Sequence, residues 1–493
     1  RRQRQMCIRD SPEIGIAIVA AFVIIIDLFV SNKKVLPVVA LVTLLIPLFL
    51  TIQLHLDTDI GSKTGFSGTF QVDDFAIFFK YLILGSTAIV ILSSTQYARR
   101  FGGHQGEYYA LILFSAAGMM LLASSMELIT LYIALELTAL PSAALAAFIR
   151  QRKSAEAGIK FLVLSAVSSA VLLYGMVLVY GLTGSSHLNE IASAITNNGL
   201  GSSPALLFGI VLITAGFGFK ISAVPFQMWA PDVYEGAPTP VTGFLSVASK
   251  AAGFAIILRV FYTSFGLDNA NIDWANMMAV LSAISMSVGN LIAIRQNNIK
   301  RMLAYSTVAQ AGYLMVGLAA ITALPGGDDN AGPIGILFYL AGYAMTNLAA
   351  FSVVIAVSNK TNNDSINSFS GLARKSPLLA GAMALAMISL IGIPPTVCFM
   401  AKIYLFSAAM DTGLEWLAIV GVINSVISAY YYLRVVKVMF LSSPKENEKD
   451  SETSYGVGAV SAAVIAMAGT FLFGIYPEPI LRIAHTAIDS LIG

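Results

Sequence analysis

Charged side chains are scarce in this sequence of 493 residues. Asp, Glu, Lys and Arg make up 11% of it, whereas soluble domains carry about 25%. Hydrophobic residues account for 57% of the chain. This composition excludes a soluble protein of several globular domains and indicates a membrane protein whose length forms spans. The net charge of +2 is too small to indicate nucleic acid as a partner.

Cysteine is scarce as well, and motifs for bound cofactors are lacking. Cys7 and Cys398 lie far apart in the sequence, so they predict neither a disulfide framework nor a metal site. The sequence has no glycine-rich nucleotide loop between a strand and a helix, and no HExxH motif. We therefore expect no cofactor, no metal ion and no redox centre on this chain.

Long apolar runs recur along the chain. Each has about 20 residues, the length that a helix needs to cross a bilayer. They predict an all-α polytopic membrane protein with about fourteen transmembrane helices. The predicted spans are 13–31, 35–55, 74–95, 107–125, 127–149, 156–182, 205–230, 240–265, 274–294, 299–323, 333–358, 377–408, 413–440 and 455–476. The basic tail at 1–12 fits nothing that follows and is expected to be non-native, and the residues after 476 are expected to form an amphipathic helix at the interface.

Basic and acidic connections alternate between these spans. The basic connections carry Lys33, Lys34, Arg99, Arg100, Arg150, Arg152, Lys153, Arg295, Lys300, Arg301, Lys360, Arg374, Lys375, Lys445 and Lys449. The acidic ones carry Asp57, Asp59, Asp73, Asp74, Glu190, Asp268, Asp273, Asp328, Asp329, Asp411 and Glu415, with Lys63 as the main exception. Under the positive-inside rule the basic connections face the cytoplasm. Both termini are then predicted to lie on the non-cytoplasmic side.

Four ionisable residues fall well inside predicted spans: Glu136, Lys220, Lys250 and Lys402. A charge at the bilayer centre costs roughly 3 kcal/mol or more, so several of them need a shared hydrated path. Burial penalises the charged form, so a buried lysine gives up a proton and a buried glutamate takes one up more readily. The four residues together predict a proton relay.

A structural interpretation stays open beside the relay. A buried lysine can pair with a carboxylate and pin two helices together. Lys160, about one turn inside the sixth predicted span, joins the candidate relay, although snorkelling to the interface explains its position as well. Asp232 and Glu235 are interpreted as loop caps or interface contacts.

Proline interrupts the seventh and twelfth predicted spans. Pro225 follows Lys220, and Pro394 and Pro395 precede Lys402. A helix break and a charge together at membrane depth suggest an ion path. The broken spans are five places apart, which predicts two inverted five-helix repeats, spans 4–8 and 9–13. The predicted units are the tail 1–12, three helices in 13–95, a first repeat in 107–265, a second in 274–440, and a last helix with the amphipathic tail in 455–493.

Several stretches resemble a known family. WAPDVYEGAPTPVTGFLSVASKAAGF, LYIALELTALPSAAL, KRMLAYSTVAQAGY and GIPPTVCFMAKIYLF are similar to the antiporter-like membrane subunits of complex I, NADH–quinone oxidoreductase. The resemblance extends over residues 13 to 480. Leu245, Ser246 and Val247 stand where the sister subunits L and M usually carry histidine, which favours the subunit N branch, the counterpart of chain 2.

The resemblance implies roles for the buried charges. Glu136 resembles the glutamate of the fifth helix and Lys220 its lysine partner on the seventh. Lys250 resembles the connecting lysine of the eighth helix, and Lys402 the lysine that leads to the far side. It implies a translocase subunit that binds no cofactor, while NADH, FMN, iron–sulfur clusters and quinone belong to other subunits.

The resemblance also implies partners and leaves alternatives. The partners would be a neighbouring antiporter-like subunit, small membrane subunits and the lipid bilayer, in the plasma membrane of a prokaryote. The alternatives are a subunit of a multi-subunit cation/proton antiporter or of a membrane-bound hydrogenase, and a structural subunit that moves no ions. The sequence leaves open the electron donor, the quinone type, and H⁺ against Na⁺.

Overall fold

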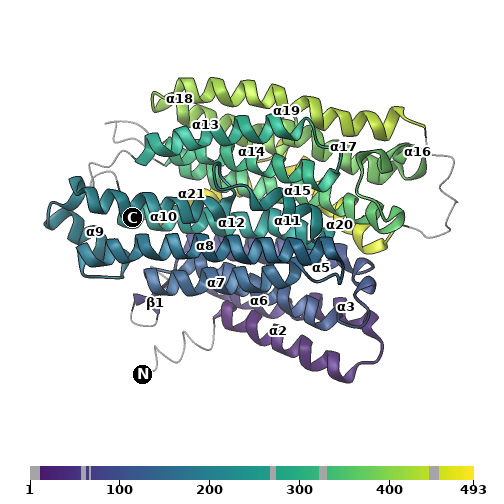
Figure 1. Cartoon of the computed structure of the whole chain (residues 1–493), viewed down its shortest axis with the longest axis horizontal. Coiled ribbons are helices and arrows are strands. Elements are labelled where there is room, and N and C mark those ends of the chain that lie inside the picture. Colours follow the sequence, from purple (N-terminus) through teal and green to yellow (C-terminus); the bar gives the residue numbers. More distant parts are fainter. Residues whose placement is uncertain are drawn as a thin grey trace.

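The computed structural model is a bundle of roughly parallel helices (Figure 1). It describes residues 11–56, 63–65, 68–266, 274–320, 330–443 and 455–492. Residues 1–10 of the tail therefore lie outside the described residues. The same holds for the predicted loop charges Asp57, Asp59, Asp268, Asp273, Asp328, Asp329, Lys445 and Lys449.

The described chain is almost entirely helical. The α-helices are α2 (Pro12–Phe29), α3 (Leu36–Thr43), α4 (Leu45–Leu56), α5 (Asp74–Ser94), α6 (Gln105–Ser124), α7 (Leu128–Ala146), α8 (Arg152–Thr183), α9 (Leu188–Asn197), α10 (Pro204–Ile221), α11 (Trp229–Gly236), α12 (Thr239–Ser264), α13 (Trp274–Ala293), α14 (Ile299–Ala319), α15 (Ala331–Thr361), α16 (Leu372–Lys375), α17 (Pro377–Ile391), α18 (Val397–Asp411), α19 (Glu415–Leu441), α20 (Val457–Ile475) and α21 (Glu478–Ile492). The 3-10 helices are η1 (Lys33–Val35), η3 (Tyr97–Phe101), η4 (Leu200–Ser202) and η5 (Ile366–Phe369), and the strands are β1 (Lys63–Gly65) and β2 (Phe70–Val72).

The polytopic architecture predicted from the apolar runs is confirmed. Among the described residues, thirteen helices are long and apolar enough to cross a membrane. The twelfth predicted span, 377–408, is absent from that set because it is divided into α17 and α18. The seventh is divided in the same way, with α10 ending at Ile221 and α11 beginning at Trp229. Pro225 lies in the first gap, and Pro394 and Pro395 lie in the second.

Two small elements were not predicted. The short helix α9 follows the sixth span, and its buried residues Leu188, Ile191 and Ile195 face the bundle. The strands β1 and β2 form an antiparallel hairpin in the connection before α5. Both elements cover the end of the bundle and add no further span.

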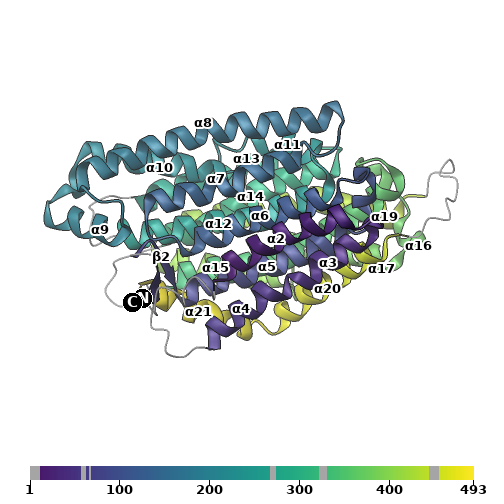
Figure 2. The same ribbon diagram turned by 90° about the horizontal axis from the view of Figure 1, so that it is seen from below.

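Helices α12, α14 and α15 form the centre of the molecule, because nearly all of their residues are buried. The long helix α8 instead exposes apolar residues such as Val167 and Val177 along its outer face. Figure 2 shows the N-terminal helices α2–α4 on the same side of the bundle as the C-terminal α20 and α21. Helix α5 joins the N-terminal helices to the C-terminal ones, since it packs against α3 and α4 and also against α20 and α21. Lys250, near the middle of α12, is therefore enclosed by the bundle.

A pair of backbone hydrogen bonds, which we call the backbone tie, connects the start of one helix to a later connection once in each predicted repeat. The Leu128 N–H donates to the Ser186 carbonyl at 2.9 Å, and the Leu188 N–H donates to the Met126 carbonyl at 3.0 Å. In the second half, Ile299 and Asp364, and Ile366 and Asn297, form the equivalent bonds at 2.8 and 2.9 Å. The first tie lies beside α9 and the second shortly before α16, and these helices lie at opposite ends of the bundle (Figure 1).

Candidate functional site

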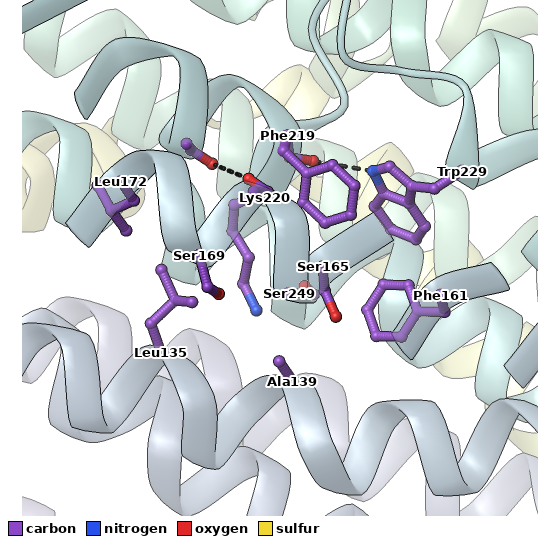
Figure 3. Close-up of a pocket in the computed structure, with 12 residues that line it drawn as sticks. Leu135, Ala139, Phe161, Ser165, Ser169, Leu172, Phe219, Lys220, Trp229 and Ser249 are labelled. Carbon is purple, nitrogen blue, oxygen red and sulfur yellow. Dashed lines mark hydrogen bonds between the residues drawn. The ribbon is translucent and has the colours of Figure 1, made fainter. Parts of the chain in front are cut away.

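Lys220 lies at the end of the first half of the broken seventh span. It is the penultimate residue of α10 and its side chain is 7% exposed. Its Nζ donates a hydrogen bond to Oγ1 of Thr138 on α7. Figure 3 shows the lysine pointing from α10 toward the helix that carries Leu135 and Ala139. The break therefore places an ammonium group between two helices in the bundle interior.

A small cavity adjoins Lys220. It leaves about 20 Å³ for the centres of water molecules, which is enough for about one buried water. Serine hydroxyls on two sides would satisfy such a water. The lining residues are Leu135, Ala139, Phe161, Ser165, Ser168, Ser169, Leu172, Gly216, Phe219, Lys220, Trp229 and Ser249.

Glu136 lies beside this cavity but forms no direct ion pair with Lys220 among the described residues. Its Oε1 accepts a hydrogen bond from the Ser169 hydroxyl on α8. Thr138, two residues further along α7, accepts from Lys220 instead. The two residues that the resemblance implies as partners thus each have a hydroxyl as their hydrogen-bond partner.

Lys250 lies near the middle of α12 and is 2% exposed. Its Nζ donates to the carbonyl of Ile221, the last residue of α10. The carbonyls in the last turn of a helix lack intrahelical partners and carry the negative end of the helix dipole, so they favour a cation. The Trp229 ring covers the ammonium, with its centroid 5.8 Å from Nζ. The Trp229 Nε1–H donates to the Phe219 carbonyl at 2.9 Å, which ties α11 back to α10 (Figure 3).

Lys402 has an equivalent environment in the second half. Its Nζ donates to the carbonyls of Leu390 and Ile391, the last two residues of α17, at 3.2 and 2.9 Å. It also donates to the Ser425 hydroxyl at 3.0 Å. The Tyr313 ring lies over the ammonium, with its centroid 4.2 Å away. The lysine is 5% exposed, and within the described part of the chain no carboxylate pairs with it.

Lys160 belongs to a different, more exposed cluster. Its Nζ lies 2.9 Å from a carboxylate oxygen of Glu156 and 2.8 Å from one of Asp232, and its side chain is 41% exposed. Arg301 on α14 pairs with Asp232 at 2.8 Å and with Glu235 at 2.9 Å. These side chains line a pocket of about 170 Å³. Asp232 and Glu235 therefore connect α11 to α8 and α14 by ion pairs, and they do not cap a loop.

Two buried ion pairs escaped the sequence reasoning. Lys80 on α5 lies 2.9 Å from Glu13 on α2, with both side chains under 8% exposed. Arg259 on α12 and Asp73 form a two-fold contact at 2.5 and 2.9 Å, and both side chains are 1% exposed. The position of Lys80 within the apolar run 74–95 could have identified it as a buried charge. Nothing in the sequence could have identified Glu13 as its partner, because the two residues are 67 positions apart.

No metal centre is found in the described residues: no three His, Cys, Asp or Glu side chains gather as a metal would require. The cysteine described by the structure, Cys398, is buried and unpaired by any disulfide. The site consists of three buried lysines and one partly buried glutamate. Lys220 and Lys402 lie on the divided spans, whereas Glu136 and Lys250 lie on the continuous helices α7 and α12.

Comparison with known proteins identifies the family. A family model described as NADH:quinone oxidoreductase/Mrp antiporter matches residues 125–428. A protein of Desulforamulus reducens named NADH-quinone oxidoreductase subunit N is 47% identical over 86% of this chain and 86% of its own length. Its namesake in Dehalococcoides mccartyi is 42% identical over 98% of this chain and 99% of its own length.

Solved structures share the fold. A chain of respiratory complex I from Thermus thermophilus is 30% identical and superposes with a TM-score of 0.76, covering 96% of this chain and 98% of its own. A chain of the Mrp complex from Dietzia superposes with a TM-score of 0.84 at 20% identity, covering 99% and 100%. The second likeness shows the fold alone, so the grouping within the family rests on the sequence matches. The chain belongs to the NADH:quinone oxidoreductase/Mrp antiporter family and groups there with the proteins named NADH-quinone oxidoreductase subunit N.

Proposed function

We propose that this chain translocates protons as subunit N of a bacterial NADH–quinone oxidoreductase, with Glu136, Lys220, Lys250 and Lys402 as the relay. One observation carries the proposal. Three lysines are buried at membrane depth, and each donates to a hydroxyl or a free helix-end carbonyl where an ion pair would be the usual partner. Without a carboxylate partner, burial favours the neutral form of such a lysine, so it gives up its proton more readily than an ion-paired lysine would, as a relay requires.

The two helix breaks supply the acceptors. An intact helix uses its carbonyls internally, whereas a break at membrane depth frees the last ones for a side chain. Lys250 uses the end of α10, and Lys402 uses the end of α17. The ends of α10 and α17 therefore act as cation sites that carry no net charge of their own. When the lysine gains or loses a proton, the net charge of the site changes by one unit.

Charge coupling orders the steps. Lys250 contacts the carbonyl of Ile221, the residue that follows Lys220. Two ammonium groups this close repel each other in a medium of low dielectric constant. Protonation of Lys220 therefore favours proton release from Lys250. A proton held on Glu136 removes the negative charge that stabilises the Lys220 ammonium, so it favours proton release from Lys220. Lys160 and its exposed carboxylate partners form, in this proposal, the surface end of the path.

The chain is proposed to consist of two inverted repeats, 107–265 and 274–440, after an N-terminal unit at 13–95. The repeated backbone ties and the paired helix breaks support this division. Orientation is proposed from loop charge: the basic connections face the cytoplasm, and both termini lie on the other side of the plasma membrane.

Electron transfer from NADH to a quinone on other subunits is the proposed driving reaction. FMN, iron–sulfur clusters and quinone would then belong to those subunits, and this chain would bind none of them. The names of the relatives favour this assembly over a cation/proton antiporter, a hydrogenase or a structural subunit that moves no ions. The neighbours would be another antiporter-like subunit and small membrane subunits.

The test is proton translocation by the purified complex carrying Lys220→Ala. The complex is reconstituted into vesicles, and protons moved per electron pair are measured. We expect the variant to assemble and to lose most of its translocation. Thr214→Val is the matched control, because Thr214 lies on the same helix and donates to the Ile210 carbonyl outside the relay. An assembled Lys220→Ala complex with the wild-type proton ratio would refute the proposal.

A further inference from the structure

A set of uncharged polar side chains fills the space between the two halves of the site. We call it the polar ladder: Ser246 on α12, Thr307 and Gln310 on α14, and Tyr339, Tyr343 and Asn347 on α15. None of these side chains is more than 2% exposed. The α15 members are four residues apart, so they form one stripe along that helix. The polar side chains next to the charged residues of the first half are thus uncharged.

Asn347 is the first residue of the polar ladder beside Lys250. Its Nδ2 donates to the Ser246 hydroxyl at 2.7 Å and to the Tyr343 hydroxyl at 3.0 Å. Tyr343 in turn donates to Thr307 Oγ1 at 3.1 Å. These bonds tie α12, α15 and α14 together at one level of the bundle.

The far end of the polar ladder reaches Lys402. Tyr339 donates to Oε1 of Gln310, which lies one turn along α14 from Thr307. The Gln310 Nε2 donates to the Leu390 carbonyl at 3.2 Å. Lys402 donates to the same carbonyl, also at 3.2 Å. The polar ladder therefore begins one helical turn from Lys250 and ends on an atom that Lys402 shares.

The hydrogen-bond directions settle which way the Asn347 amide points. Ser246 donates its own proton to the Gly243 carbonyl at 2.8 Å, and Tyr343 donates to Thr307, so both hydroxyl oxygens have to accept from Asn347. The amide nitrogen faces them, and Oδ1 is left over. This oxygen is fully buried, and among the described residues it has no donor. A buried acceptor without a donor costs free energy, so a donor is expected there.

Lys250 lies on α12 close to Ser246, the residue that Asn347 contacts. It follows Ser246 by four residues and so projects from the same face of α12, one turn away. We propose that Asn347 Oδ1 is a second acceptor for the Lys250 ammonium, reached directly or through one bound water. Lys250 then has one acceptor in each half of the protein, the Ile221 carbonyl on α10 and Asn347 on α15.

The inference rests on the proposed relay and assigns Asn347 a positioning role in it. Charge on Lys220 repels Lys250 from the Ile221 carbonyl, and Asn347 receives the ammonium on the side that faces α14 and α15. The amide keeps its own protons throughout. The polar ladder holds the amide nitrogen in place, so that its oxygen stays turned toward the lysine.

An experimental map of the wild-type complex that shows ordered water tests the contact itself. We expect Lys250 Nζ, or a water molecule that also contacts Lys250 Nζ, within hydrogen-bond distance of Asn347 Oδ1. An Oδ1 with no donor, or with a water that does not contact Lys250, overturns the inference. This measurement does not depend on pumping, so it remains decisive even if the proposed function fails.

Asn347→Leu tests the role. In the assembled complex we expect on the order of a tenfold loss of translocation, since a hydrogen bond to a charged group is lost, together with an altered pH profile. The control is Thr346→Val: Thr346 is the buried neighbour on α15, and its hydroxyl meets Ser389 at 3.1 Å, outside the polar ladder. A wild-type proton ratio and pH profile in Asn347→Leu, with Lys220→Ala inactive, overturns the inference and leaves the function standing. If Asn347→Leu prevents assembly of the complex, the map of the wild-type complex decides the inference.

Discussion

The two halves of the molecule use one backbone plan with different chemistry. Each has a span that ends in a left-handed residue, Ser222 after α10 and Gly392 after α17, and resumes after a proline. In each, a lysine donates to the freed carbonyls under an aromatic ring. The first half, however, adds Glu136 and a second lysine, whereas the interior of the second half adds tyrosines and amides.

Under the proposed relay, this difference separates two ways in which a residue acts. The charges of Glu136, Lys220 and Lys250 are proposed to influence one another's protonation, whereas Lys402 has only uncharged hydrogen-bond partners among the described residues. We therefore expect substitutions in the first half to act through charge, and those in the second half to act through geometry and single hydrogen bonds.

The largest effect is expected at Glu136. It is the ninth residue of α7, and Thr307 is the ninth residue of α14. Glu136→Gln keeps the size and the Ser169 contact but removes the charge, and a coupling of about 1–3 kcal/mol between sites changes occupancy about 5–150-fold. Protons per electron pair, measured in reconstituted vesicles, should fall accordingly.

Thr307→Val is the matched variant in the second half. It removes two uncharged hydrogen bonds, to the Leu303 carbonyl and from the Tyr343 hydroxyl, each worth about 1 kcal/mol. Because no charge is lost, its loss of translocation should be smaller than that of Glu136→Gln. Equal losses in the two variants would show that the halves do not differ in the way described.

The helix ends give the next contrast. At Gly392 a Cβ would meet Lys402 Cδ at 3.0 Å, and the backbone φ of +90° strains any other residue. Gly392→Ala should destabilise the subunit by about 1–2 kcal/mol and displace Lys402. Ser222→Gly relieves a φ of +60° and should be neutral or stabilising. Thermal inactivation of the purified complex measures both.

Gly381→Ala provides the control for these glycine changes. Gly381 lies within α17 with nothing inside 4 Å of an added Cβ, so alanine should be tolerated there. If Gly392→Ala were as harmless as Gly381→Ala, the close fit around Lys402 would be unimportant.

Two substitutions at Tyr313 distinguish the contribution of its ring, which lies over Lys402, from the contribution of its hydroxyl. Tyr313→Phe keeps the ring face and loses only contacts of 3.4 Å to Ser425 and Asn290. Tyr313→Leu removes the cation–π contact, worth about 0.5–2 kcal/mol, and so disfavours the ammonium. The alkaline limb of the pH profile of translocation should move to lower pH in Tyr313→Leu and stay in place in Tyr313→Phe. The reverse order would mean that the hydroxyl is the functional group.

The smallest effect is expected where the halves meet at the surface. Arg301 on α14 reaches Asp232 and Glu235 on α11, and all three side chains are about one-third exposed. Such pairs contribute about 0–1 kcal/mol and are screened by salt. Arg301→Gln should therefore lower the stability of the complex slightly at low ionic strength and not at high ionic strength. A large loss that salt does not reduce would show that these pairs hold the halves together.

Much of this architecture was readable from the sequence, because a bilayer imposes local requirements. Span length, the breaks at Pro225 and at Pro394 and Pro395, and the lysines at membrane depth are properties of short stretches. The candidate relay residues were identified for the same reason: a charge within an apolar run is conspicuous wherever its partners are. The thirteen long helices of the described residues, and the division of the seventh and twelfth predicted spans, follow from these signals.

The partners of those charges were decided by tertiary structure alone. The sequence suggested a Glu136–Lys220 pair, whereas packing gives Glu136 to Ser169 and Lys220 to Thr138. It gave no sign that Lys80 would meet Glu13, or that the Asn347 oxygen would be left open. The type of a side chain and its depth in the bilayer are set by its own segment. Its hydrogen-bond partners lie on other helices of the chain, whose positions follow only from how the whole bundle packs.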